Sequence, residues 1–285
     1  MDSPKTFLTG LLGEHIAASR SPEIHQNEAI ALGQVLVYRM IDFERLQLGE
    51  GDIESILRAA EYFGFDGLNI TFPFKQKIIS YLNELSVEAT TIGSVNTILF
   101  RAGRRIGHNT DWFGFSENFK SGLKNVSIKK VTQIGAGGAG AAVAYALLRL
   151  GVQQLFIVDI DYQKAEALAL RMQANFPASS LTAGADVATI IPASDGVVQT
   201  TPVGMVSHPG IPFYAALLTP AHWIAEIIYF PLETELLKYA RSIGCKTISG
   251  GGMVVYQAAK AFELFTGIKP DVERMMRRFW EGIPK

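Results

Sequence analysis

With 285 residues, 48% of them hydrophobic, the chain is long enough for two domains that each bury a substantial core. Its formal net charge of −1 provides no basic excess for a phosphate backbone, so we expect no nucleic-acid partner. The one cysteine, Cys245, excludes an intrachain disulfide and a cysteine-based zinc site, which favours a reducing, cytoplasmic location. Neither a basic leader before an apolar segment nor a membrane-length apolar run occurs, so we expect no membrane association.

Strand and helix patterns alternate through the first hundred or so residues. Strands are expected at 6–13, 35–42 and 65–72, helices at 21–34, 52–64, 75–85 and 86–94, and a β-hairpin turning near Gly103 at 95–111. This alternation is typical of a mostly parallel sheet that is covered on both faces. We therefore predict an α/β substrate-binding domain over residues 1–111.

A second α/β unit follows a helical segment at 112–123. A strand, a glycine-rich turn and an alanine-rich helix span 129–151, and a strand at 152–161 completes a βαβ unit. Further strand candidates at 195–201, 222–229 and 245–250 extend the sheet, which predicts a Rossmann-type doubly wound domain over 112–249. The helical segments within 250–285 have no strand left to cover, and we expect them to pack back on the first domain.

The glycine turn carries the first chemical signal. In "GAGGAG", Gly135, Gly137 and Gly140 match the dinucleotide fingerprint directly after an apolar strand and before a helix. The fingerprint allows a tight turn, a close approach of the pyrophosphate and close packing of helix on strand. The whole turn is a predicted cofactor site, consisting of Gly135, Ala136, Gly137, Gly138, Ala139 and Gly140.

Asp159 ends the next strand, where a carboxylate accepts hydrogen bonds from the ribose hydroxyls. The same carboxylate repels the 2′-phosphate of NADP, and "VDIDYQK" provides only Lys164 as a cation. The sequence therefore favours NAD over NADP. Asp161 is interpreted as a helix N-cap and not as a ligand.

A hydride transfer from an alcohol also needs a group that takes the hydroxyl proton. The candidates are Lys75, Asp111 and the five histidines His15, His25, His108, His208 and His222. Lys75 follows "TFPF" at the end of an apolar strand, a setting that disfavours its charged form and suits a proton shuttle. Asp111 could supply a compensating carboxylate, and the alternative for this pair is a buried salt bridge between the domains.

Several motifs together resemble the shikimate and quinate dehydrogenase family. In chain order they are "SRSP" followed by "IH", "NITFPFK", "GSVNT", "GHNTDWFG", "GAGGAG" and "GGGMVVYQA". The resemblance spans the chain and implies an NAD(P)-dependent oxidoreductase that acts on a CH–OH group. It also implies the roles of individual residues.

By this resemblance, Lys75 and Asp111 match the catalytic pair, and Ser19 and Ser21 match the serines that bind the substrate carboxylate. Side chains expected to contact the ring or its hydroxyls are Asn69, Thr71, Asn96, Tyr229 and Gln257, with a plain core aromatic as the alternative for Tyr229. Thr200 and Pro202, with Gly204 turning the loop, and Gly252 are expected beside the cofactor. No metal is implied.

The chain also departs from the family pattern. It has "DID" where NADP-dependent members carry "NRT", which is similar to the NAD-preferring quinate/shikimate branch. "QTTP" replaces "NATS", and Gln26 stands where asparagine is common. The expected reaction is transfer of hydride from C3 of shikimate or quinate to NAD while Lys75 takes the hydroxyl proton. A paralogue acting on an amino-substituted ring and a non-catalytic dinucleotide sensor remain alternatives, and the sequence leaves open the preferred ring, a biosynthetic or catabolic role, and monomer or homodimer.

Overall fold

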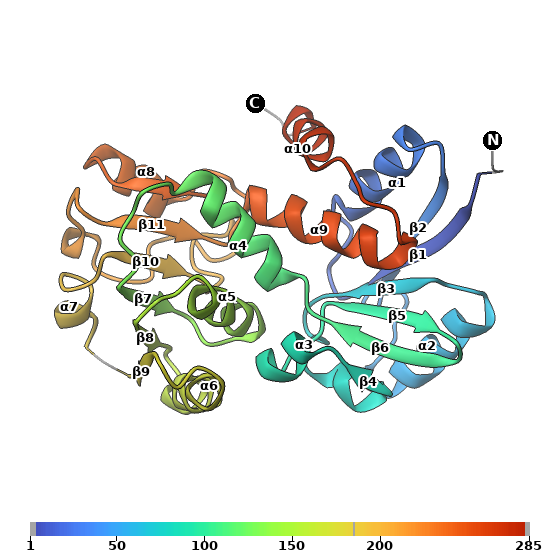
Figure 1. Cartoon of the computed structure of the whole chain (residues 1–285), viewed down its shortest axis with the longest axis horizontal. Helices are drawn as coiled ribbons and strands as arrows, with labels where there is room; N and C mark the ends of the chain where they lie inside the picture. Colours follow the sequence, from blue (N-terminus) through green and yellow to red (C-terminus); the bar gives the residue numbers. More distant parts are fainter. Residues whose placement is uncertain (1–3, 185, 283–285) are drawn as a thin grey trace. The chain divides into compact units, whose positions relative to one another are not determined.

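A computed structural model describes residues 4–184 and 186–282, which form two compact α/β units (Figure 1). Unit 1 contains the described residues up to Thr110 and those from Val255 onward, and unit 2 is Asp111–Val254. Within the described ranges, no helix is long and apolar enough to cross a membrane. The expected α/β fold class is confirmed, whereas the assignment of substrate to 1–111 and of NAD to 112–249 stays a prediction.

Unit 1 is built on a mixed six-stranded sheet in the order β2-β1-β3-β5-β6-β4. Its strands are β1 (Thr6–Gly13), β2 (Val35–Asp42), β3 (Gly67–Ile70), β4 (Glu84–Leu85), β5 (Thr97–Arg101) and β6 (Arg104–His108). Its helices are α1 (Ser21–Ala31), η1 (Glu50–Asp52), α2 (Ile53–Tyr62), η2 (Lys77–Tyr81) and α3 (Val87–Ile92). The helix expected over 75–85 is wrong, because the segment folds as the 3₁₀ helix η2 and the short strand β4.

The sheet is less parallel than the alternating pattern predicts. β1 pairs in parallel with β2 and β3, but β5 runs antiparallel to both β3 and β6. The antiparallel β5–β6 pair is a hairpin, whose two loop residues Ala102 and Gly103 have φ of 50° and 71°. Positive φ at both loop positions matches the right-handed twist of the strands, so the predicted turn at Gly103 is confirmed.

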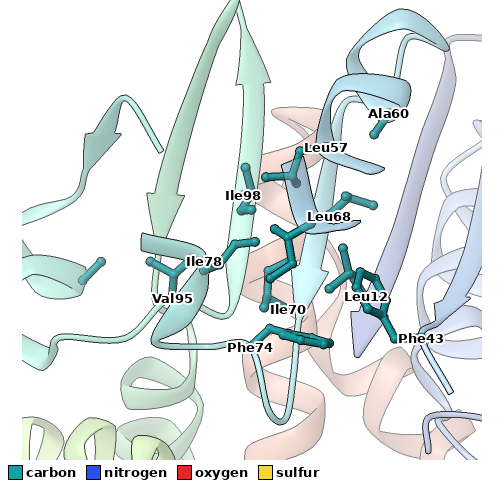
Figure 2. Close-up of a cluster of buried hydrophobic side chains, with 12 residues drawn as sticks. Leu12, Phe43, Leu57, Ala60, Leu68, Ile70, Phe74, Ile78, Val95 and Ile98 are labelled. Atoms are coloured by element: carbon teal, nitrogen blue, oxygen red, sulfur yellow. The ribbon is translucent and has the colours of Figure 1, made fainter. Parts of the chain in front are cut away.

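One apolar core cluster of unit 1 lies between this sheet and α2 (Figure 2). Leu12, Leu68 and Ile98 project from β1, β3 and β5 and meet Leu57 of α2. Burying side chains of this size contributes roughly 1.5–3 kcal/mol each, which fixes the ends of these strands, where the polar residues of the site lie.

The C-terminal helices α9 (Gly251–Thr266) and α10 (Val272–Glu281) complete the chain, and the boundary between the units falls inside α9. α10 lies beside α1 in Figure 1, and the buried Glu28 carboxylate of α1 accepts 2.7 and 2.9 Å hydrogen bonds from the Arg274 guanidinium. The prediction that these helices return to the first domain is confirmed.

Unit 2 is a fully parallel sheet in the order β12-β11-β10-β7-β8-β9. Its strands are β7 (Lys130–Ile134), β8 (Gln154–Val158), β9 (Ser180–Ala183), β10 (Gly196–Gln199), β11 (Trp223–Glu226) and β12 (Lys246–Ile248). Its helices are α4 (Asp111–Gly122), α5 (Gly138–Arg149), α6 (Tyr162–Asn175), α7 (Val187–Ile190), η3 (Ala215–Leu217) and α8 (Glu235–Ser242). Counted from β7, this is the doubly wound order 3-2-1-4-5-6, in which ligands bind where the order reverses, between β7 and β10.

Candidate active site

The glycine turn connects β7 to α5 at this reversal point. Gly135 has φ of 107°, and a Cβ there would lie 2.6 Å from Thr200 Oγ1. A Cβ on Gly140 would lie 2.6 Å from the Gly135 carbonyl oxygen. These two positions therefore require glycine for the packing of the protein itself. A Cβ on Gly137 would meet no atom within 4 Å, so space for a ligand remains above this position.

Two buried glutamines hydrogen-bond to the backbone of the loops that follow β7 and β10. Gln133 Nε2, at the end of β7, donates 2.8 and 2.9 Å hydrogen bonds to the carbonyls of Gly135 and Gly140. Gln199, at the end of β10, accepts from the Thr201 amide at 2.8 Å and donates to the Val203 carbonyl. Through these bonds, Gln133 fixes the backbone of the glycine turn at the start of α5.

The carboxylate of Asp159 is fixed beside the same turn. Its Oδ2 accepts a 2.7 Å hydrogen bond from the Ala136 amide, and its Oδ1 accepts a 2.9 Å bond from the Asp161 amide. Asp161 accepts in turn from the amides of Gln163 and Lys164, which confirms its predicted N-cap role at α6. The turn, the space above Gly137 and this carboxylate fit the pyrophosphate and ribose of a dinucleotide.

The loop after β10 holds Thr200, Pro202 and Gly204. Thr200 Oγ1 donates to the carbonyls of Ile134 and Gly135, so this residue packs directly on the glycine turn. Gly204 has φ of 112°, and its amide donates to the His208 carbonyl at 2.7 Å, which closes the loop as expected for a turning glycine.

Glu226, at the end of β11, is a buried carboxylate beneath this loop. It is 1% exposed; Oε2 accepts from the Thr234 hydroxyl, and Oε1 has no hydrogen-bond partner among the described residues. Burial raises the pKa of Glu226 to about 7, against the lowering effect of the Thr234 bond.

Gly252 has a packing role that its sequence motif does not indicate. A Cβ there would collide with the Asn118 side chain, whose Nδ2 donates to the Ser249 carbonyl at 2.9 Å. The structure thus explains the glycine by packing within unit 2, and the predicted contact of Gly252 with the cofactor stays a prediction.

The two predicted serines lie together at the start of α1. Ser19 Oγ is 3.2 Å from Ser21 Oγ and also accepts from the Ser21 amide at 3.3 Å. Arg20 between them turns away, donating to the Phe279 carbonyl at 2.7 Å and to Glu23. The serine hydroxyls, at the positive end of a helix dipole, are thus the groups here that could bind a carboxylate.

A buried polar network contains three of the predicted ring-binding residues, Asn69, Asn96 and Gln257. Asn96 Oδ1 accepts from the Thr110 amide at 2.7 Å, and its Nδ2 donates to Thr110 Oγ1 at 2.9 Å. Thr110 Oγ1 lies 3.3 Å from Gln257 Oε1, and Asn69 Nδ2 donates to the Asn96 carbonyl at 3.3 Å. The structure therefore brings residues from β3, the start of β5 and α9 into one hydrogen-bonded group.

Lys75 lies in the turn between β3 and η2, not in a strand, which corrects the expected strand-like setting. The two phenylalanines before it separate, because Phe72 is 68% exposed whereas Phe74 is 1% exposed and packs on Phe43 at 4.6 Å between ring centroids (Figure 2). Phe74 thus anchors the turn in the core, and the Lys75 carbonyl accepts from the Val95 amide at 2.8 Å. The Lys75 side chain is half-buried, and Thr71, which directly follows β3, is also half-buried.

Asp111 and Tyr229 belong to unit 2. Asp111 is the buried first residue of α4 and directly follows Thr110 of the polar network. Tyr229 is 41% exposed, so the alternative that it is a plain core aromatic is wrong. Lys75 belongs to unit 1, so the meeting of Lys75 with Asp111 stays a prediction.

The five histidines lie in separate settings. His222 accepts from the Thr219 amide at 2.8 Å and lies 3.0 Å from the Ile191 carbonyl, while His15 pairs with Glu44 and His208 with Ser207. Burial lowers the pKa of both His25, to about 3, and His108. In the part of the chain that the structure describes, no cluster of three metal-ligating side chains occurs.

Three residues beside the predicted sites escaped the sequence analysis: Tyr38, Thr110 and Gln133. Gln133 carries a weak sequence signal, because it is a polar residue inside the apolar run before the glycine turn. Tyr38 and Thr110 carry none, since their partners Asn69, Asn96 and Gln257 are distant in the sequence.

Three family models match the chain in succession. They describe a shikimate dehydrogenase substrate binding domain over residues 11–98, a shikimate/quinate 5-dehydrogenase over 117–203 and a shikimate 5′-dehydrogenase C-terminal domain over 250–278. Together they span most of the chain.

Similar proteins include enzymes with either cofactor. Shikimate dehydrogenase (NADP(+)) of Streptomyces avermitilis is 47% identical over 273 residues, 95% of this chain and 94% of the relative. Quinate/shikimate dehydrogenase (NAD(+)) of Corynebacterium glutamicum strain R is 45% identical over 278 residues, 96% and 98% of the two chains. The solved structure of quinate dehydrogenase from Corynebacterium glutamicum in complex with NAD is 44% identical and superposes with a TM-score of 0.92 over 97% and 99% of the chains.

Proposed function

The chain belongs to the shikimate and quinate dehydrogenase family, and we propose that it oxidises the C3 hydroxyl of shikimate, quinate or both with NAD as the preferred cofactor. The products are 3-dehydroshikimate and 3-dehydroquinate. The observation that carries the choice of cofactor is the Asp159 carboxylate, held at the glycine turn by the Ala136 amide at 2.7 Å.

This carboxylate supports NAD for an electrostatic reason. A ribose offers hydroxyl donors to Asp159, whereas a 2′-phosphate would place negative charge beside it. Lys164, the cation of this segment, lies 3.5 Å from Asp161 and is mostly exposed, so its charge is already compensated. The relatives named for NADP and for NAD are 47% and 45% identical to this chain, so overall similarity does not distinguish the two cofactors. The proposal of NAD therefore rests on the carboxylate of Asp159.

The serine pair supports recognition of a carboxylate-bearing ring. Ser19 and Ser21 present two hydroxyls at the amino end of α1, while Arg20 is engaged with Glu23 and the Phe279 carbonyl. Hydroxyl donors bind a carboxylate without a salt bridge, and the Asn96, Thr110 and Gln257 group provides amide and hydroxyl partners for ring hydroxyls.

In the proposed mechanism, Lys75 takes the proton from the C3 hydroxyl during oxidation and returns it during reduction. NAD, when bound, supplies the acceptor for the hydride that leaves C3. Asp111 holds the Lys75 ammonium after it has taken the proton and bonds a neighbouring hydroxyl, so the two side chains act as one coupled pair. The fixed backbone of the Lys75 turn supports this role, because positioning is a large part of proton-transfer catalysis.

The test is turnover of shikimate and of quinate with NAD and with NADP, measured by absorbance of the reduced nicotinamide. We expect a higher kcat/KM with NAD than with NADP for at least one acid. Turnover of neither acid would overturn the reaction, and a preference for NADP would overturn the cofactor assignment. Turnover of only an amino-substituted ring would point to the paralogue instead.

A further inference from the structure

We propose that Tyr38 is a positioning residue for the ring substrate, whose buried hydroxyl holds Asn69 in place. The inference rests on the proposed function, because Asn69 is one of its ring-binding candidates. It adds a residue from β2, a strand in which the sequence indicates no functional side chain.

The contacts of the Tyr38 hydroxyl carry the proposal. Tyr38 is 5% exposed, and its Oη donates a 2.8 Å hydrogen bond to Asn69 Oδ1. This bond joins β2 to the polar end of β3 across the intervening strand β1.

Asn69 depends on this bond for its orientation. Its Nδ2 donates to the Asn96 carbonyl at 3.3 Å and to Thr97 Oγ1 at 3.0 Å, which uses both amide hydrogens. The Tyr38 donor on Oδ1 fixes which way the amide faces, and one lone pair of Oδ1 remains for a ring hydroxyl. Without the Tyr38 hydroxyl, this buried carbonyl loses its donor.

The surroundings of Tyr38 make its hydroxyl separable from its ring. The ring packs on His25 at 4.9 Å between centroids, and His25 in turn contacts Phe262 and Phe265 at 6.1 and 5.9 Å. Neither nitrogen of His25 has a hydrogen-bond partner among the described residues, so His25 acts as part of an apolar wall. Tyr38→Phe keeps the contact with this wall and removes the hydroxyl alone.

The experiment compares wild type with Tyr38→Phe in KM and kcat for shikimate and quinate, in KM for NAD, and in substrate Kd by calorimetry without cofactor. We expect KM and Kd for the ring substrate to rise about tenfold, the effect of losing one buried hydrogen bond, with little change in KM for NAD. In an Asn69→Ala background, Tyr38→Phe should have almost no further effect.

Tyr81→Phe is the matched control, because Tyr81 is a partly buried tyrosine of the same unit in the apolar core cluster, and its substrate KM should equal that of wild type. An unchanged substrate KM and Kd in Tyr38→Phe would overturn the proposal, as would an equal rise in KM for NAD, which indicates a general structural effect. A wild-type protein that turns over neither acid would instead overturn the proposed function.

Discussion

The carboxylate of Asp159 and the amide of Ala136 are joined by a 2.7 Å hydrogen bond. This bond connects the end of β8 to the glycine turn after β7 and fixes the negative charge at one point of the turn. Because this charge is held in place, we propose that Asp159 determines which cofactor is preferred.

Asp159→Ser should raise the ratio of kcat/KM for NADP to that for NAD by at least about tenfold, because it removes the repulsion of the 2′-phosphate. Steady-state kinetics with both cofactors measure this ratio. Asp161→Ser is the control, since serine also caps a helix and the residue serves α6; its ratio should match that of wild type. An unchanged ratio in Asp159→Ser would refute the electrostatic argument.

Lys75→Ala should lower kcat by about two to four orders of magnitude while NAD still binds, because the hydroxyl proton loses its acceptor. Turnover and NAD binding by fluorescence titration check both parts. Lys77→Ala is a control from the same motif, because Lys77 pairs with Glu50 at the surface and should be dispensable. If Lys75→Ala keeps most of its turnover, the proton is transferred elsewhere.

Gly137→Ala should fold with a stability within about 0.5 kcal/mol of wild type, because its added Cβ meets no protein atom and its φ of −73° suits alanine. The Cβ would project into the space expected for the pyrophosphate, so the Kd for NAD should rise at least about tenfold. Thermal melts and titration with NAD give the two values.

Gly140→Ala provides the contrast to this result. Its Cβ would lie 2.6 Å from the Gly135 carbonyl oxygen, so it should lower the free energy of unfolding by about 1–3 kcal/mol. Equal NAD affinity in Gly137→Ala and wild type would show that no ligand approaches this position.

Glu226→Gln should change how stability depends on pH. Burial raises the pKa of Glu226 from its ordinary value of 4.5 to about 7 in the folded protein. Between these two pH values, the folded protein therefore binds more protons than the unfolded chain. The stability of the wild type falls as pH rises through this range. The amide side chain of the variant does not ionise. Relative to wild type, the variant should therefore gain roughly 3 kcal/mol between about pH 5 and about pH 8.

Urea unfolding at the two pH values measures this gain. Glu235→Gln is the control, because Glu235 is exposed at the start of α8 and its loss should leave the pH dependence as in wild type. A parallel pH dependence of wild type and Glu226→Gln would contradict the burial argument.

Local sequence patterns predicted most of the regular elements because their apolar periodicity reflects burial directly. β9 was missed because its four residues alternate between exposed and half-buried, which leaves almost no apolar signal. The 75–85 segment was interpreted as a helix because spacing in so short a stretch does not separate a 3₁₀ turn from an α-helix.

The site was predictable to the extent that its residues lie in recognisable motifs. The glycine turn and Asp159 follow from spacing, and the serines, Lys75 and Asn96 follow from the family resemblance. The sequence could not show that Phe74 is buried while Phe72 is exposed, because the direction of each ring depends on the turn. Nor could it show the Tyr38–Asn69 bond, whose partners are 31 residues apart on strands separated by β1.

Unit 2 is one uninterrupted stretch of chain, whereas unit 1 is made of two pieces on either side of it. During synthesis, the whole parallel sheet can therefore form as soon as its own residues have left the ribosome. The buried Glu28 carboxylate of unit 1 gains its Arg274 partner only when α10 has been made. A protein expressed without α10 should accordingly retain a folded unit 2 and expose unit 1 to proteolysis.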